Sequence, residues 1–212
     1  MSAVRGLLGR VPRAAWACFL VALANGLAWS LIVPPFQVPD ENAHYAYVQQ
    51  VAERGTLPRQ LPPGSGLSPR EDRTIDALLT FGIVGHRENP APDTEAQQQV
   101  LDQVAREGLP ARGSGDALSA TANPPLYYAL EAIPYKLMPS GNVLDKLAAM
   151  RCLSALMGAL TVLLVFMFLR ELLPATPWAW PAGALLVAFQ PLFGFISGGV
   201  NNDNLLYLAG AG

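Results

Sequence analysis

Three long apolar runs, separated by polar segments, dominate the pattern of hydrophobic and polar positions along the chain. The first extends from about Ala14 to Val33 and contains no charged residue. The second covers residues 148–169 and the third covers residues 178–196. An α-helix needs about 20 mostly apolar residues to cross the hydrocarbon core of a bilayer. The pattern therefore predicts an all-α integral membrane protein with about three transmembrane helices.

The first run has a competing interpretation, a cleaved signal peptide, because Arg5, Arg10 and Arg13 precede it. The apolar part of a signal peptide is only about 7–15 residues long. This run is longer, and no clean cleavage site of small residues ends it. We therefore interpret it as an uncleaved membrane anchor.

The segments around these runs complete the expected layout. Residues 1–13 form a cytoplasmic N-terminus, 14–33 the first membrane helix, and 34–147 an extracytoplasmic loop with juxtamembrane helices. The second helix covers 148–169, a cytoplasmic turn covers 170–177, and the third helix covers 178–196. Residues 197–212 then form an outer turn and the start of a fourth helix. Because the chain stops as that helix begins, we expect an N-terminal fragment.

The orientation of the chain follows from its Lys and Arg residues, which are enriched in cytoplasmic loops. Three arginines precede the first run, whereas the stretch after it carries Asp40 and Glu41 and no basic residue before Arg54. This predicts a multi-pass protein of the cytoplasmic membrane with its N-terminus inside and the long loop outside. Lys146 and Arg151 flank the outer end of the second run and argue the other way, but the first helix usually dominates.

Composition narrows the possible functions. Apolar residues make up 51% of the chain and charged residues only 14%, which is too apolar for an ordinary soluble domain. The net charge is -2 and no basic stripe follows any expected helix, so we expect no nucleic-acid partner. Cys18 and Cys152 both lie in apolar runs, and we interpret both as small apolar fillers.

The long loop is too long for a simple connection. Its middle, from about Arg54 to Thr121, is rich in Pro, Gly, Gln and charge and is expected to hold one polar helix near residues 95–106. His86 in this part is expected to be solvated. Residues 123–138 place Leu and Ile at helical spacing and add three tyrosines, which favour the headgroup level of a membrane. This predicts an interfacial helix on the outer leaflet.

The segment directly after the first run, PPFQVPDENAH, is the strongest candidate for chemistry. Pro39 and Asp40 predict the start of a helix on which Asp40 and His44, four residues apart, share a face. Together with Glu41, such a group could bind a divalent cation such as Mg²⁺ or Mn²⁺ through Asp40 and His44, or accept a proton from a hydroxyl. The simpler interpretation is that Asp40 caps the helix, Glu41 favours its positive end, and His44 is a surface residue.

Two further motifs stand beside later membrane helices. NPPLYY, residues 123–128, is typical of a capped helix start, since Pro is favoured in the first turn. SGGVNNDN, residues 197–204, is typical of a tight turn between two helices. Both have these structural roles as their simplest interpretation. An Asp between apolar helices nevertheless needs a partner or water.

The three motifs, in this order, resemble a bacterial "predicted membrane protein" family of unknown function, which is similar in layout to GT-C glycosyltransferases. Those multi-helix enzymes transfer a sugar from a polyprenyl-phosphate carrier outside the cytoplasmic membrane. The resemblance implies that Asp40 is a catalytic base or metal ligand, supported by Glu41 and His44. It also implies that five residues contact substrate: His44, Asn123, Tyr127, Asn202 and Asp203. Asn123 stands where relatives often have histidine.

Two functions therefore remain open. The first is a glycosyltransferase that acts on lipid-linked sugars in cell-envelope glycan assembly. The second is a non-catalytic membrane subunit, or an inactive truncated fragment, that binds envelope glycan or a partner. The enzymes of the resemblance have more membrane helices than this chain, which implies that the fragment alone is inactive. No P-loop, dinucleotide fingerprint, metalloprotease pair or nucleophile elbow is present.

Overall fold

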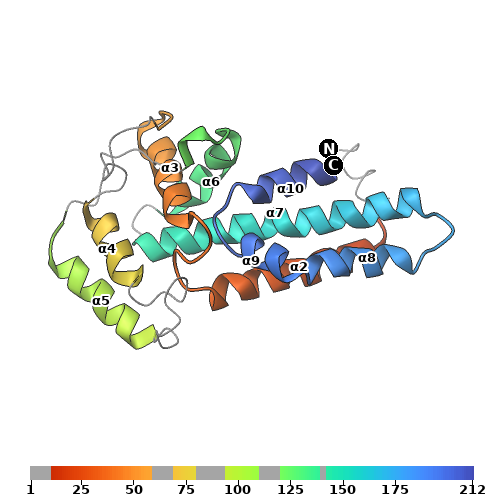
Figure 1. Cartoon of the computed structure of the whole chain (residues 1–212), viewed down its shortest axis with the longest axis horizontal. Helices are drawn as coiled ribbons and strands as arrows, with labels where there is room; N and C mark the ends of the chain where they lie inside the picture. Colours follow the sequence, from red (N-terminus) through yellow and green to blue (C-terminus); the bar gives the residue numbers. More distant parts are fainter. Residues whose placement is uncertain (1–10, 59–68, 80–93, 110–119, 139–141) are drawn as a thin grey trace. The chain divides into compact units, whose positions relative to one another are not determined.

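All regular structure in the described part of the chain is helical (Figure 1). The structure, a computed structural model, describes residues 11–58, 69–79, 94–109, 120–138 and 142–212. The all-α prediction is confirmed for these ranges. The chain divides into two compact units. Unit 1 comprises Met1–Leu31, Arg151–Gly199 and Asp203–Gly212, and unit 2 comprises Ile32–Met150 and Val200–Asn202.

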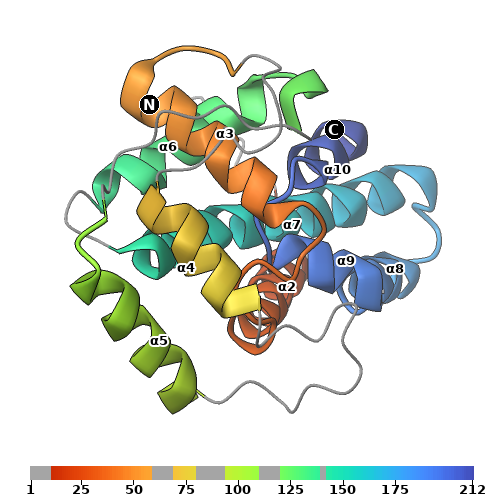
Figure 2. The same cartoon turned by 60° about the vertical axis from the view of Figure 1, so that its left-hand side comes forward.

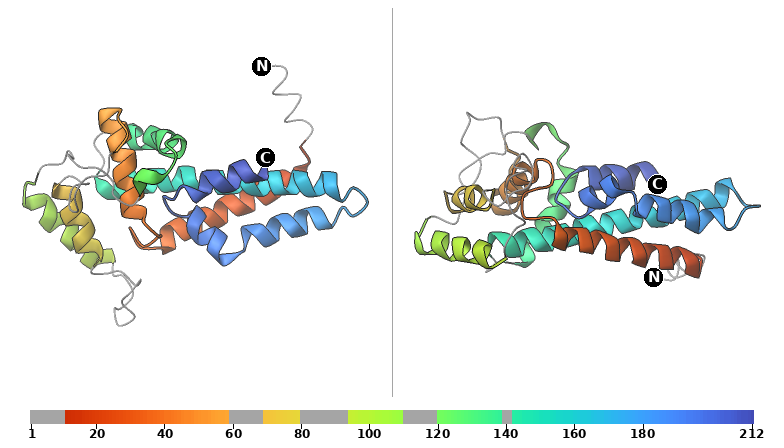
Figure 3. Two further views of the ribbon diagram at one scale, coloured as in Figure 1. Left: turned by 45° about the horizontal axis from the view of Figure 1, so that its top comes forward. Right: turned by 60° about the horizontal axis from the view of Figure 1, so that its bottom comes forward.

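Unit 1 holds the apolar helices, of which α2, α7 and α8 run alongside one another (Figure 3). In the described residues, α2 and α7 are each long and apolar enough to cross a membrane, and α8 with α9 makes a third crossing if the pair counts as one. A membrane protein with two or three candidate spans agrees with the sequence pattern. The bounds are α2 Arg13–Ile32, α7 Val143–Leu172, α8 Ala179–Ala188, α9 Pro191–Ser197 and α10 Asp203–Ala211.

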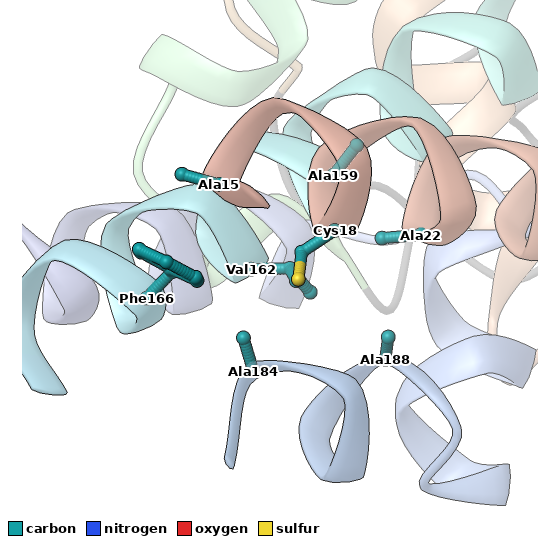
Figure 4. Packing of buried hydrophobic residues seen from close by; sticks show 8 residues of the cluster. All are labelled: Ala15, Cys18, Ala22, Ala159, Val162, Phe166, Ala184 and Ala188. Carbon is teal, nitrogen blue, oxygen red and sulfur yellow. The ribbon is translucent and has the colours of Figure 1, made fainter. Parts of the chain in front are cut away.

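Small side chains line the contacts among these three helices (Figure 4). Ala and Cys let helix backbones approach closely, which is how helices associate where no hydrophobic effect drives them together. The prediction that Cys18 is a small apolar filler is confirmed, whereas Cys152 is exposed, so the same prediction is wrong there. The buried cluster comprises Ala15, Cys18 and Ala22 of α2, Ala159, Val162 and Phe166 of α7, and Ala184 and Ala188 of α8.

The third apolar run is two helices where the sequence pattern predicted one. Between α8 and α9 the chain bends by 62°. Pro191 has no backbone N–H and forces Gln190 into an extended conformation, so the first helix must end there. The Gln190 side chain then caps the second helix by accepting the Phe193 N–H at 2.6 Å.

Unit 2 contains two pairs of packed helices, α3 on α6 and α4 on α5 (Figure 2). The polar helix expected near residues 95–106 is confirmed as α5. The expectation of one helix in the middle of the loop is wrong, because α4 is a second one that packs against α5. Arg73 and Glu107 form an ion pair at 3.5 Å beside the α4–α5 pair. The bounds are α3 Glu41–Arg54, α4 Pro69–Leu79, α5 Thr94–Arg106, the short 3₁₀ helix η1 Ala120–Ala122, and α6 Leu126–Leu137.

Helix α6 turns its tyrosines toward the protein. Tyr127, Tyr128 and Tyr135 are all buried, with at most 4% of any side chain exposed. They therefore face α3 and not lipid, whereas the level of α6 in the membrane stays a prediction. Leucine and isoleucine form the exposed face instead, with Leu126 60%, Ile133 57% and Leu137 73% exposed.

Candidate functional site

The three motifs singled out in the sequence meet in unit 2 through hydrogen bonds. The Val200 N–H donates to the Glu41 carboxylate at 2.9 Å. The Asn201 side-chain amide donates to the Pro39 carbonyl at 3.2 Å, and the Asn123 amide donates to Asn202 Oδ1 at 3.5 Å. The turn after α9 therefore bonds both to the start of α3 and to the start of α6.

Asp40 holds the N-cap position of α3, but its side chain does not cap the helix. Its backbone is left-handed, with φ 55° and ψ 18°, whereas a side-chain cap needs an extended N-cap residue. The capping role predicted for Asp40 is therefore wrong. Phe36, four residues earlier, is also left-handed at φ 62°. Non-glycine residues adopt this conformation at a cost of about 1–2 kcal/mol each. The loop thus holds an exposed carboxylate on a strained backbone.

Glu41 lies next to Asp40 in the chain and has the opposite environment. Its side chain is fully buried. The hydrogen bond from Val200 joins it to a residue 159 positions away. A buried carboxylate is stable only when such donors replace the water it has lost. Glu41 is thus built to hold a chain segment in place.

His44 is buried, with 4% of its surface exposed, so its interpretation as a surface residue is wrong. Its Nδ1 lies 2.9 Å from the hydroxyl of Tyr128, and the two rings stack at 5.8 Å. The Asn123 amide donates to the same hydroxyl at 3.0 Å. One phenol oxygen therefore connects the first motif to the second.

Tyr47 and Tyr128 fix this arrangement by face-to-face stacking. Their ring centroids are 3.6 Å apart and their planes differ by 8°. The Tyr47 hydroxyl donates to the Asn123 carbonyl at 3.4 Å. Burial raises the pKa of the Tyr47 phenol above its ordinary value, so this hydroxyl keeps its proton at neutral pH.

The other two candidate substrate residues are Tyr127 and Asp203. Tyr127 is buried at 1% exposure, edge-on to Tyr128 at 5.4 Å. Asp203 belongs to unit 1, where it stands half-buried in the first turn of α10. Next to it, the buried Asn204 donates to the carbonyls of Ile196 and Gly199, both at 3.1 Å, and so ties α10 to the end of α9.

Neither metal binding nor substrate contact is tested by this geometry. Over the described residues, no group of three or more His, Cys, Asp or Glu side chains is arranged to hold a metal ion. The Asp40–His44 ligand pair and its Mg²⁺ or Mn²⁺ therefore stay predictions. His86 lies outside the described residues.

Sequence reasoning missed the contacts that hold the site together. Tyr128 and Tyr47 were not candidates, although they bond and stack at its centre. Glu131 of α6 is fully buried as well. The tyrosine pair in NPPLYY is the one available indication, because two adjacent aromatics on a helix point to different sides. The chain itself does not reveal which tyrosine faces α3.

Fold and site together define a helical integral membrane protein whose motifs are joined by hydrogen bonds within unit 2. Residues 23–211 match the family described as "Predicted membrane protein (DUF2142)", and the chain belongs to this family. The function of this family is unknown. No curated protein and no solved structure matches the chain.

Proposed function

We propose that this protein is a membrane glycosyltransferase of GT-C-like layout that acts on lipid-linked sugars in cell-envelope glycan assembly. The proposal rests first on the family, whose members are predicted membrane proteins. It rests second on one carboxylate, that of Asp40. This group follows the first candidate span by a few residues and takes no part in capping its helix.

The contrast between Asp40 and its neighbours carries the proposal. Glu41 and His44 are buried and hydrogen-bonded within unit 2, whereas Asp40 is exposed. Left-handed non-glycine residues cluster at functional sites, where the surrounding structure holds the strain. We assign Glu41 and His44 to positioning and Asp40 to contact with substrate.

The chemistry needs one base at the reacting hydroxyl. The acceptor oxygen attacks the anomeric carbon of the sugar and forms the new C–O bond. The bond from that carbon to the phosphate oxygen breaks, and polyprenyl phosphate leaves with the electron pair. Asp40 accepts the proton of the acceptor hydroxyl. A divalent cation held by Asp40 could neutralise the leaving phosphate, and Asn123, Tyr127, Asn202 and Asp203 are the candidate substrate contacts.

The test is Asp40→Asn in the full-length protein. Asparagine accepts left-handed backbone conformations, so this variant removes the charge and keeps the loop. We expect insertion into membranes unchanged and transfer of labelled sugar from polyprenyl-phosphate donors reduced by at least about 100-fold, as for loss of a general base. Asp40→Glu, which keeps a carboxylate, is the comparison variant.

Three results separate the alternatives. Unchanged transfer in Asp40→Asn removes Asp40 from the mechanism. Saturable binding of the lipid-linked sugar with no turnover in the wild type favours a non-catalytic glycan-binding subunit. Loss of transfer on chelation, restored by Mg²⁺ or Mn²⁺, supports the cation, and transfer that resists chelation removes it.

A further inference from the structure

The hydroxyl of Tyr128 occupies the centre of the site, between two side chains from different segments. It is 2.9 Å from His44 Nδ1 and 3.0 Å from the Asn123 amide nitrogen. We infer that Tyr128 is a positioning residue that holds His44 as the neutral tautomer with its proton on Nε2, which makes His44 a hydrogen-bond donor and not a metal ligand. The inference rests on the proposed function only for the reaction in which His44 takes part. The tautomer of His44 does not depend on it.

The direction of the hydrogen bonds follows from the chemistry of the three groups. An amide nitrogen carries only donors, so Asn123 donates into a lone pair of the phenol oxygen. A hydroxyl that accepts a hydrogen bond becomes a stronger donor itself. Nδ1 of His44 lies within hydrogen-bond distance of the Tyr128 hydroxyl. We therefore assign the donation as running from Asn123 to Tyr128 to His44.

The surroundings keep the phenol in this position. Tyr128 has no exposed surface, and it stacks on Tyr47 at 3.6 Å. The His44 ring lies at 5.8 Å with its plane tilted by 23°. A buried ring stacked this closely on Tyr47 cannot swing its hydroxyl away from Nδ1 without losing the stacking contact.

The tautomer decides what His44 can do. With Nδ1 accepting from Tyr128, the remaining ring proton is on Nε2. Neither nitrogen then offers a lone pair to a cation, because metal ligation needs an unprotonated and uncommitted ring nitrogen. Whatever faces Nε2, in the protein or in a ligand, must be an acceptor such as a hydroxyl, carbonyl or phosphate oxygen. Among the two candidate ligands of a cation, only Asp40 remains.

The experiment reads the tautomer directly. The chain has two histidines, so His86→Gln leaves His44 as the single imidazole. The full chain, with ¹⁵N-labelled histidine in lipid nanodiscs at pH 7, is measured by long-range ¹H–¹⁵N correlation. We expect an acceptor-type Nδ1 and a protonated Nε2 in a single species. A proton on Nδ1, or a mixture of tautomers, overturns the inference without any variant.

Two variants separate the Tyr128 hydroxyl from general packing. Tyr128→Phe removes the donor to Nδ1 and should replace the single tautomer with a mixture. Tyr47→Phe removes from the same stacked pair the hydroxyl that donates to the Asn123 carbonyl, and it should leave the spectrum unchanged. An unchanged spectrum in Tyr128→Phe contradicts the positioning role.

A third arm tests the metal. Mg²⁺, which is diamagnetic, changes the ¹⁵N shift of a ring nitrogen that binds it directly, and we expect both His44 nitrogen shifts to stay unchanged at equimolar Mg²⁺. A changed nitrogen shift that marks direct ligation overturns the inference. None of these spectra depends on sugar transfer, so a failed transfer assay and a failed tautomer assignment remain distinguishable.

Discussion

The backbone N–H of Val200 donates to the carboxylate of Glu41 at 2.9 Å, and both groups are fully buried. The bond joins the turn after α9 to the first turn of α3. It makes the position of the PPFQVPD loop depend on a residue 159 positions further along the chain. The first and third motifs are thus one structural element, and disturbing either should disturb both.

Glu41→Ala should therefore lower the stability of the fold. It leaves the buried Val200 N–H without its acceptor, which costs about 1–3 kcal/mol. Glu41→Gln keeps an acceptor oxygen and should lose less. Thermal unfolding in detergent measures both, with Glu171→Ala at the exposed end of α7 as a surface control. Equal stability of Glu41→Ala and wild type would show that the bond contributes nothing.

The left-handed backbone of Asp40 predicts an unusual order of variants. Asp40→Gly should be as stable as wild type or more so, because glycine adopts φ 55° without strain. Asp40→Ala should be less stable by about 1 kcal/mol, since alanine pays for a positive φ. A conventional N-cap would give losses in both variants. Unfolding midpoints of the two proteins distinguish these cases.

Gly198 lies close to the Trp29–Ser30 segment of α2. A Cβ there would stand 2.7 Å from Trp29 Cβ and 2.8 Å from the Ser30 nitrogen. Gly198→Ala should therefore destabilise the protein by about 1–3 kcal/mol. Gly210→Ala is the matched control, because nothing lies within 4 Å of its added Cβ. Because Gly210 is in a helix, its replacement by alanine should raise the free energy of unfolding by about 0.5–1 kcal/mol. Similar unfolding curves for the two variants would contradict the close approach.

Two basic residues near the start of the second apolar run show what charge counting misses. Arg151 is buried and donates to the Ser30 carbonyl at 3.0 Å in the last turn of α2. Lys146 donates to the Tyr135 hydroxyl at 3.1 Å. Both residues therefore have structural partners, which account for their positions without any preference for the cytoplasmic side of a membrane. The argument they made against a cytoplasmic N-terminus loses weight, and the orientation itself stays a prediction.

The periodicity and length of the apolar runs predicted the helices well, but they did not predict the contacts between helices. Apolar runs of membrane length with very few charges are sufficient to locate α2 and α7, because burying charge in hydrocarbon is so unfavourable. Pro191 within the third run was a local indication of its break. The pairing of Tyr47 with Tyr128 was out of reach, since it depends on how two helices 81 positions apart pack. The order of the motifs in the sequence indicated the candidate site residues. Only the structure showed that Asp40 is exposed whereas Glu41 is buried.

The α4 helix carries a pH-dependent contribution to stability. Burial, and then the neighbouring Asp76, raise the pKa of the Asp72 carboxyl. A raised pKa means that the folded state favours the protonated form, so the stabilisation is complete below the ordinary pKa of about 4 and is lost as pH rises through the folded value. Asp72→Asn should therefore raise the unfolding midpoint at pH 7 and leave it unchanged at pH 3. A gain of equal size at both values would contradict this assignment.

The exposed face of α6 predicts contact with lipid on that side of the helix. Withdrawing a leucine or isoleucine from water contributes about 1.5–3 kcal/mol, and Ile133 and Leu137 are both largely exposed in the protein. The candidate membrane helix α7 begins six residues after α6 ends. The connection between them is therefore short enough for α6 to lie at the membrane interface. An environment-sensitive dye on a cysteine at either position should shift to the blue in vesicles and be quenched by nitroxide lipids.

The label needs a background in which Cys18 and Cys152 are replaced by alanine. Cys18→Ala suits the alanine-rich cluster around it, and Cys152 is already exposed. A cysteine at Asp102, exposed on the polar helix α5, is the matched control and should report water. If Ile133 and Leu137 report water as well, the apolar face of α6 contacts protein and not lipid. The interfacial role then fails while the packing of α6 on α3 stands.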